Sequence, residues 1–176
     1  ILKPQEALVL TLFGKYIGTI KGEGFYFVNP FCSSVNPAAN TKLNQSGDVK
    51  TGAAQIASMK MSMKIMTLSN NKQKINDCLG NPVEIGIAVM WRVVDTAKAV
   101  FDVDDYESFV YTVTETALRH VASIYAYDHM EDDDSNANAI TLRTNIEEVS
   151  HALMEELDRR LEMAGIDVLD SRLTHL

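Results

Sequence analysis

Histidines can serve as general bases or metal ligands near neutral pH, and the 176-residue chain has four of them. They are His120, His129, His151 and His175, and no two form the H-E-x-x-H pair that places two zinc ligands on one helix face. We expect His120 and His151 to lie on separate helices, as capping or surface residues. The histidines therefore predict no metal site.

An acidic segment, residues 131–138, comes closer to a metal-binding loop. Three of its residues fit positions 1, 3 and 5 of an EF-hand frame: Asp132, Asp134 and Asn136. Two required features are missing, because position 6 is Ala137 instead of glycine and position 12 is Arg143 instead of glutamate. We expect a solvated loop in which Ser135 or Asn136 helps to cap the next helix.

The remaining chemical motifs are also incomplete. Gly22-Glu23-Gly24 is too short for a phosphate-binding loop and predicts a tight turn. No serine stands in a G-x-S-x-G elbow, and Cys32 and Cys78 are far apart and outside any C-x-x-C pattern. Four methionines, Met59, Met61, Met63 and Met66, are interpreted as core residues and not as soft-metal ligands. We predict no catalytic residue, no cofactor-binding residue and no metal site, so the chain is not expected to be an enzyme.

The composition excludes further classes of function. A net charge of −8, with lysines and arginines scattered along the chain, argues against nucleic-acid binding. In the strand region the longest run without a strongly polar residue is 85–91, far shorter than the roughly 20 apolar residues of a spanning helix. We expect no segment of the chain to insert into a bilayer.

The length predicts one domain over residues 1–176. The chain starts without methionine at Ile1 and stops at Leu176 inside a segment that still has an ordered pattern. We therefore expect it to be the core of a longer protein.

The first part of the chain predicts short strands separated by turns. Two patterns predict strands: alternation of apolar and polar residues, and short runs of aliphatic or aromatic residues. They occur at 8–13, 16–20, 25–28, 59–65, 72–79 and 83–93. Gly80-Asn81-Pro82 predicts a hairpin turn before the last of these strands. Residues 32–58 are rich in small and polar side chains, and we expect a long flexible loop there.

The second part changes to a helical period. Asp95 predicts the cap of a short helix, and Asp104 or Asp105 the cap of a longer one that reaches Ile124. A further helix carries an apolar stripe from Ile146 to Ala164, with ion pairs expected between Glu155 and Arg159 and between Glu156 and Arg160, and with Gly165 as its C-cap residue. A strand starts at Ile166, and its apolar phase slips at Leu169, which predicts a bulge or an edge. The order of strands, helices and strand predicts an α+β fold, with a mostly antiparallel sheet packed on two main amphipathic helices.

Several segments, in this order, resemble a known family. They are 13–20, 24–31, Asn76-Asp77 with Gly80-Asn81-Pro82, 87–96, Ala117-Leu118-Arg119, 164–168 and 171–174. Together they are similar to bacterial members of the SPFH/band 7 family (stomatin, prohibitin, flotillin, HflK/C), and the similarity covers nearly the whole chain.

The resemblance implies a non-catalytic scaffold without a cofactor. Such a protein homo-oligomerises, contacts the membrane through a flanking segment outside this chain, continues into a C-terminal coiled coil, and organises membrane microdomains or regulates membrane proteins or a membrane protease. The domain is then expected on the cytoplasmic side. Two alternatives remain: a soluble protein-binding adaptor, and a ligand-binding or enzymatic domain that uses residues 32–58 as a lid.

Overall fold

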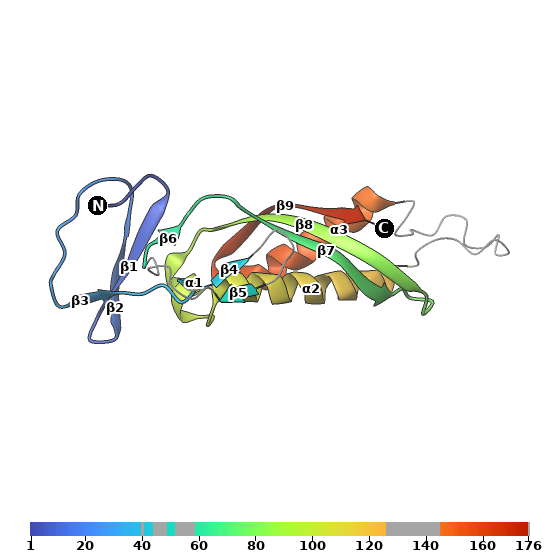
Figure 1. Cartoon of the computed structure of the whole chain (residues 1–176), viewed down its shortest axis with the longest axis horizontal. Coiled ribbons are helices and arrows are strands. Elements are labelled where there is room, and N and C mark those ends of the chain that lie inside the picture. Colours follow the sequence, from blue (N-terminus) through green and yellow to red (C-terminus); the bar gives the residue numbers. More distant parts are fainter. Residues whose placement is uncertain (40, 44–48, 52–58, 126–144, 176) are drawn as a thin grey trace.

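The computed structural model of the chain describes residues 1–39, 41–43, 49–51, 59–125 and 145–175. The elements follow in the order β1 (Glu6–Leu12), β2 (Lys15–Lys21), β3 (Cys32–Ser34), β4 (Thr41–Leu43), β5 (Val49–Thr51), β6 (Met61–Ser62), β7 (Met66–Asn76), β8 (Pro82–Val93), α1 (Thr96–Phe101), α2 (Tyr106–Ile124), α3 (Ile146–Leu161), the 3-10 turn η2 (Glu162–Ala164) and β9 (Ile166–His175). Strands come first, helices next and a strand last, so the predicted α+β class is confirmed (Figure 1).

The main sheet has the order β7-β8-β9, and both pairings are antiparallel. Its centre is β8, in which every odd residue from Val83 to Val93 is buried while Glu84, Met90 and Arg92 are exposed. This is the alternation that the sequence predicts for a strand with one face in the core. The sheet is therefore covered on one face.

Helices α2 and α3 provide that cover and run along the long axis of the molecule beneath the sheet (Figure 1). From α3 come Val149, Leu153, Leu157 and Leu161, all fully buried. At the start of α2, Asp105 caps the helix, and the Tyr106 ring packs edge-on against Trp91 with centroids 6.4 Å apart. Burial raises the pKa of the Tyr106 hydroxyl, and the neighbouring carboxylates of Glu107 and Asp105 add to the shift.

A smaller sheet forms the other end of the molecule (Figure 1). It has the order β2-β1-β3, and β6 pairs with β1 beside β3. Val9 and Met61 belong to the same core cluster as the main sheet and helices. The two sheets therefore share one continuous core.

Three contacts join α1 and the end of α3 to their surroundings. The Thr96 hydroxyl donates to the Thr19 hydroxyl at 2.9 Å, and the rings of Tyr16 and Phe101 meet edge-on at 5.4 Å. Gly165, with φ +66°, is the predicted C-cap, and its carbonyl accepts the amides of Val94 and Asp95.

Residues 32–58 are the main correction to the sequence prediction. The flexible loop expected there contains three short strands in its described part, β3, β4 and β5. β3 pairs with β1 through Leu10–Ser34 and Leu12–Cys32, and β4 pairs with β5. A strand of three residues is too short to show a period of alternating apolar and polar residues in the sequence. Such a strand is recognised only by its pairing with another strand in the structure. Residues 40, 44–48 and 52–58 lie outside the described residues.

The strand predicted over 59–65 is also wrong in most of its length. Only Met61–Ser62 is a strand, Met61 alone is fully buried, and Met59 and Ile65 are exposed. The reason is that this segment crosses from the small sheet to the main one, so its residues do not share one pleated surface. Met63 and Met66 pack only partly against the core.

Other local predictions have mixed outcomes. The β7–β8 turn forms at the predicted residues, and the carboxylate of buried Asp77 accepts the amides of Leu79 and Asn81 at 2.9 and 2.8 Å. In β9 the register slips between Asp170 and Val168, so the bulge predicted at Leu169 is confirmed. On α3, Glu156 binds both Arg159 and Arg160, so the predicted pair of Glu155 with Arg159 is wrong.

Candidate functional site: an exposed apolar tip

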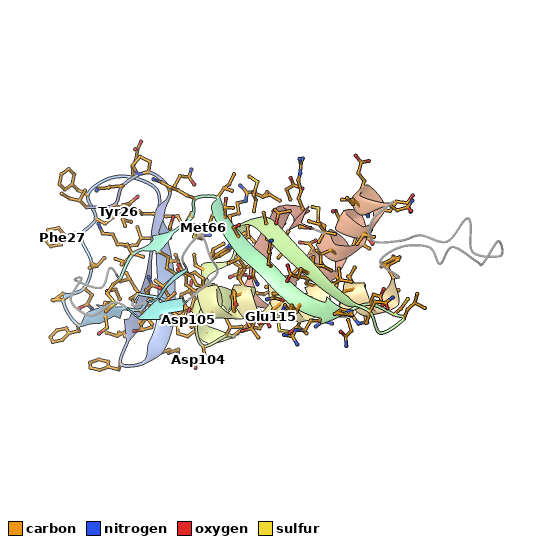
Figure 2. The ribbon with its side chains drawn as sticks, turned by 45° about the vertical axis from the view of Figure 1, so that its right-hand side comes forward. Tyr26, Phe27, Met66, Asp104, Asp105 and Glu115 are labelled. Atoms are coloured by element: carbon orange, nitrogen blue, oxygen red, sulfur yellow. The ribbon has the colours of Figure 1, made fainter. Side chains whose placement is uncertain are left out.

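The connection between β2 and β3, residues 22–31, presents aromatic side chains to solvent. Phe25 is 85 % exposed, Phe31 72 % and Phe27 completely. Tyr26 and Val28 are exposed to a lesser degree. Figure 2 shows Phe27 projecting from the end of the molecule formed by the small sheet.

Polar contacts hold this connection in a defined shape. Leu2 and Gly24 exchange backbone hydrogen bonds of 2.9 and 3.0 Å, which anchor its first half to the start of the chain. The Tyr26 hydroxyl donates towards the carbonyls of Lys21 and Gly22 at 3.3 Å each. The side-chain oxygen of Asn29 accepts the amide of Phe31 at 3.0 Å. These contacts hold the two ends of the connection, while its phenylalanine rings stay exposed.

The β1–β2 turn adds further apolar surface at the same end. Phe13 is 90 % exposed in this turn and has a φ of +48°. Ile17 on β2 and Ile1 are also exposed. We call the exposed apolar side chains of this end the apolar tip: Ile1, Phe13, Ile17, Phe25, Tyr26, Phe27, Val28 and Phe31.

Charge is distributed unevenly between the tip and the rest of the chain. Residues 1–39 contain three lysines, Lys3, Lys15 and Lys21, and two glutamates, Glu6 and Glu23, which gives +1. With −8 for the whole chain, the remaining residues carry −9. A hydrogen bond from the Lys3 amide and the nearby Lys60 ammonium lower the pKa of Glu6. The apolar rings of the tip thus lie in a segment of slightly positive net charge, although the whole chain is acidic.

The sequence prediction missed this tip. Residues 25–28 were expected to form a strand, but they pair with no described strand. Gly22 and Gly24, with φ of +98° and +137°, turn the chain out of the sheet before the aromatic run begins. The signal was present in the sequence, because turn-forming residues flank the aromatic run on both sides: Gly22 and Gly24 before it and Asn29-Pro30 after it.

The chemical candidates of the sequence do not assemble around the tip or elsewhere in the described chain. His120 is exposed on α2, and His151 is exposed on α3 with its Nδ1 atom 3.6 Å from Glu155. Cys32 and Cys78 are free thiols. Among the described residues no three His, Cys, Asp or Glu side chains come together as a metal site. His129 and the acidic segment 131–138 lie outside the described residues, as does the side chain of His175.

The sequence model of the SPFH domain / Band 7 family matches residues 1–176. The chain belongs to this family. Stomatin, prohibitin and flotillin are members, and SPFH proteins are in general membrane-associated and non-enzymatic. No curated protein matches the chain significantly. Within the part of this SPFH domain that the structure describes, no helix is long and apolar enough to cross a bilayer.

Proposed function

We propose that this SPFH domain is a non-catalytic scaffold that rests on a membrane through its apolar tip and assembles with other copies of itself. The exposed rings of Phe13, Phe25, Phe27 and Phe31 carry the proposal. Exposed apolar patches of this kind mark interaction surfaces, and aromatic side chains favour the boundary between lipid headgroups and acyl chains. Full burial of one phenylalanine is worth about 1.5–3 kcal/mol, so several rings together would hold the domain on a bilayer.

The charge distribution supports a membrane over a protein as the partner of the tip. The cytoplasmic leaflet is negatively charged, so a surface with a charge of −9 would be repelled from it while the +1 region would not. This arrangement directs the tip, and not the acidic remainder, towards the lipid. Within the assembly, the domain would organise membrane microdomains or regulate membrane proteins such as a protease on the cytoplasmic side. The proposal departs from the expectation that the membrane is reached only through a flanking segment outside this chain; such a segment would add to the anchoring by the tip.

Vesicle flotation tests the role of the tip. The wild-type chain is expected to float with phosphatidylcholine vesicles that also contain phosphatidylserine, an anionic lipid of cytoplasmic leaflets. The variant F25S/F27S/F31S should bind the vesicles with a partition coefficient at least about tenfold lower, because each ring contributes more than 1 kcal/mol. These side chains are exposed, so unfolding temperature should hardly change.

The matched control removes exposed apolar side chains elsewhere. Leu79, in the β7–β8 turn, and Met163, after α3, are about as exposed as several tip residues. The variant L79S/M163S should float like the wild type. If it loses as much binding as the tip variant, or if the wild type does not float at all, the tip is not the membrane contact and the soluble adaptor becomes the better hypothesis.

Self-assembly is tested separately by light scattering of the chain, and of a longer form with the proposed flanking segments in detergent. We expect large particles for the longer form and weak association for residues 1–176 alone. A monodisperse monomer in both cases would contradict the scaffold.

A further inference from the structure

The aromatic segment of the apolar tip, residues 25–28, has an unpaired backbone. No hydrogen bond of the described chain involves a backbone N–H or carbonyl group of these four residues. The nearest backbone bonds lie on either side of the segment, between Leu2 and Gly24 and from the Cys32 amide to the Asn29 carbonyl at 3.0 Å. All four residues are exposed, so water can hydrogen-bond to their backbone groups.

An unpaired backbone limits how deeply the tip can enter a bilayer. The hydrocarbon core contains no water, so an N–H or carbonyl group that enters it without a partner loses its hydrogen bond. The cost for one such group is about as large as the gain from burying one phenylalanine ring. Residues 25–28 carry four N–H groups and four carbonyls, whereas Phe25, Phe27 and Phe31 supply three rings. The segment is therefore kept out of the hydrocarbon core and confined to the hydrated headgroup region.

Glu23 limits the depth independently of the backbone. Its carboxylate is exposed two residues before Phe25 and takes part in no ion pair of the described chain. The Tyr26 hydroxyl donates to the carbonyls of Lys21 and Gly22, which ties the aromatic segment to the residues beside Glu23. Deep insertion of the rings would carry this carboxylate towards the hydrocarbon, where a charged side chain is costly.

We propose that the apolar tip is a shallow wedge that selects membranes with loosely packed lipids, because its rings fill gaps between headgroups and do not enter the hydrocarbon core. The inference rests on the membrane contact of the proposed function and specifies which lipid surface that contact prefers. Apolar groups that insert at this depth bind with an affinity that depends on curvature and lipid composition. Tightly packed lipids offer few gaps and leave the rings in water.

Vesicles of constant phosphatidylserine content test the selection, because they vary packing without varying charge. One comparison is between small and large vesicles of the same unsaturated lipids, and it isolates curvature. The other is between large vesicles of these lipids with and without added cholesterol, and it isolates acyl-chain packing. Partition coefficients are referred to the lipid of the outer leaflet.

The wild-type partition coefficient should be at least about fivefold higher on the loosely packed member of each pair, since full burial of a single ring is worth about tenfold or more. The variant F25S/F27S/F31S should bind all these vesicles weakly and without a preference. Its weak binding alone would follow from any apolar contact, whereas the loss of the preference is specific to the wedge.

Fluorescence quenching measures the depth of the tip directly. In the variant F27W the added indole replaces a completely exposed ring. Trp91, the single tryptophan of the chain, is buried against Tyr106 and supplies a background that the wild type measures. Lipids with a quencher at the headgroup should reduce the F27W emission strongly, and lipids with a quencher at the end of the acyl chain should leave it unchanged.

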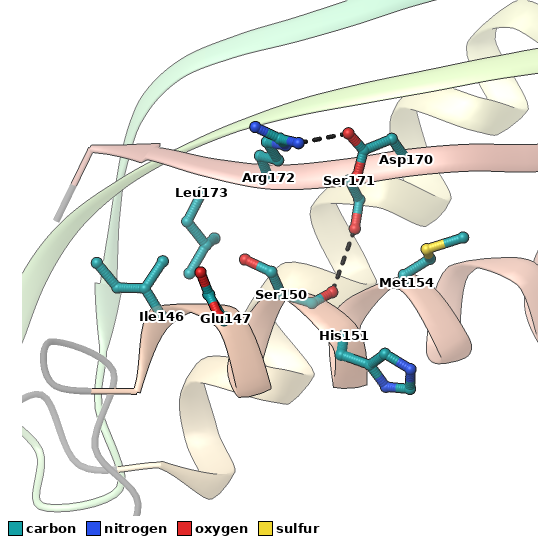
Figure 3. Close-up of a pocket in the computed structure, with 9 residues that line it drawn as sticks. All are labelled: Ile146, Glu147, Ser150, His151, Met154, Asp170, Ser171, Arg172 and Leu173. Atoms are coloured by element: carbon teal, nitrogen blue, oxygen red, sulfur yellow. Dashed lines mark hydrogen bonds and ion pairs between the residues drawn. The ribbon is translucent and has the colours of Figure 1, made fainter.

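The control variant I146W places an indole at the other end of the molecule. Ile146 is 42 % exposed and lines the hollow between α3 and β9 (Figure 3). The start of α3 lies at the end of the long axis opposite the small sheet (Figure 1). With the tip on the lipid, neither quencher should reduce the I146W emission below the change seen in the wild type.

The wedge is overturned if the quencher at the end of the acyl chain acts most strongly on F27W, because the tip would then lie in the hydrocarbon core. Equal partitioning of the wild type on both members of each pair would also overturn it. In either case binding itself persists, so the membrane contact of the proposed function is kept. If the wild type binds none of the vesicles, the membrane contact fails and the wedge fails with it.

Discussion

Among the described glycines with a positive φ, Gly165 leaves the least room for a side chain. It has φ +66°, a conformation that costs an L residue about 1–2 kcal/mol. A Cβ atom added there would also meet the carbonyl oxygen of Asp95, and it would lie 2.7 Å from the Asp95 Cβ atom. Because Asp95 caps α1 and Gly165 precedes β9, the substitution acts where a helix cap and the last strand touch.

We therefore expect G165A to lower the free energy of unfolding by about 3 kcal/mol, measured by urea denaturation. Gly80 is the matched control, since its φ is +84° and nothing lies within 4 Å of an added Cβ. G80A should cost only about 1 kcal/mol, the conformational part alone. If G165A and G80A lowered the free energy of unfolding equally, the close approach of Gly165 to Asp95 would contribute nothing to the loss.

For single residues, the sequence predicted the local role, such as capping a helix, better than it predicted which distant residue is in contact. Gly165 as a helix C-cap and Asp95 as an N-cap follow from local chemistry, and both are confirmed. Their close approach links residues 70 positions apart, which no local pattern encodes. The apolar tip was missed for the same reason, because exposure depends on which segments fail to find a partner.

Among the elements, α3 offers a test of pH dependence. Arg159 and Arg160 donate hydrogen bonds to Glu156 at 2.8 and 2.6 Å, and these bonds lower the pKa of that carboxyl. A carboxylate with a lowered folded-state pKa stabilises the fold above its unfolded-state pKa, and the contribution disappears as the pH falls through the folded-state value. For a pair at the surface the contribution is less than about 1 kcal/mol.

We expect E156Q to be less stable than the wild type at pH 7 and equally stable near pH 3, as measured by urea denaturation at a series of pH values. Glu155 is the control, since its partner His151 is 3.6 Å away and both side chains are more than 70 % exposed. E155Q should show a smaller change with pH. A difference for E156Q that is the same at pH 3 and pH 7 would contradict the role of the ionised carboxylate.

Strands could be predicted where one face is buried, because burial of one face makes apolar and polar residues alternate along the strand. β8 alternates over its whole length because one face lies on α2 and α3, and its bounds follow directly. The slip at Leu169 was equally visible, because a bulge shifts the apolar phase. Residues 59–65 misled the prediction because alternating methionines cross between two sheets there. Residues 25–28 misled the prediction because aromatic residues are enriched in strands, although this run pairs with no described strand.

For the whole molecule, the proposed orientation on the membrane predicts which basic residues strengthen binding. A basic side chain near an anionic membrane surface contributes about 1 kcal/mol, or roughly fivefold in partitioning. Lys15 and Lys21 lie at the two ends of β2, within the small sheet that carries the tip, whereas Lys72 and Lys74 lie on β7 of the main sheet. If the tip faces the lipid, only the first pair reaches the surface potential.

K15Q/K21Q should accordingly weaken binding to vesicles that contain phosphatidylserine by about five- to 25-fold, and binding to pure phosphatidylcholine should hardly change. K72Q/K74Q removes the same charge and should leave binding to both kinds of vesicle unchanged. With the tip on the lipid, the distance from β7 to the membrane surface would exceed the Debye length of about 8 Å at physiological salt. An equal loss from the β7 pair would mean that the domain lies flat on the bilayer.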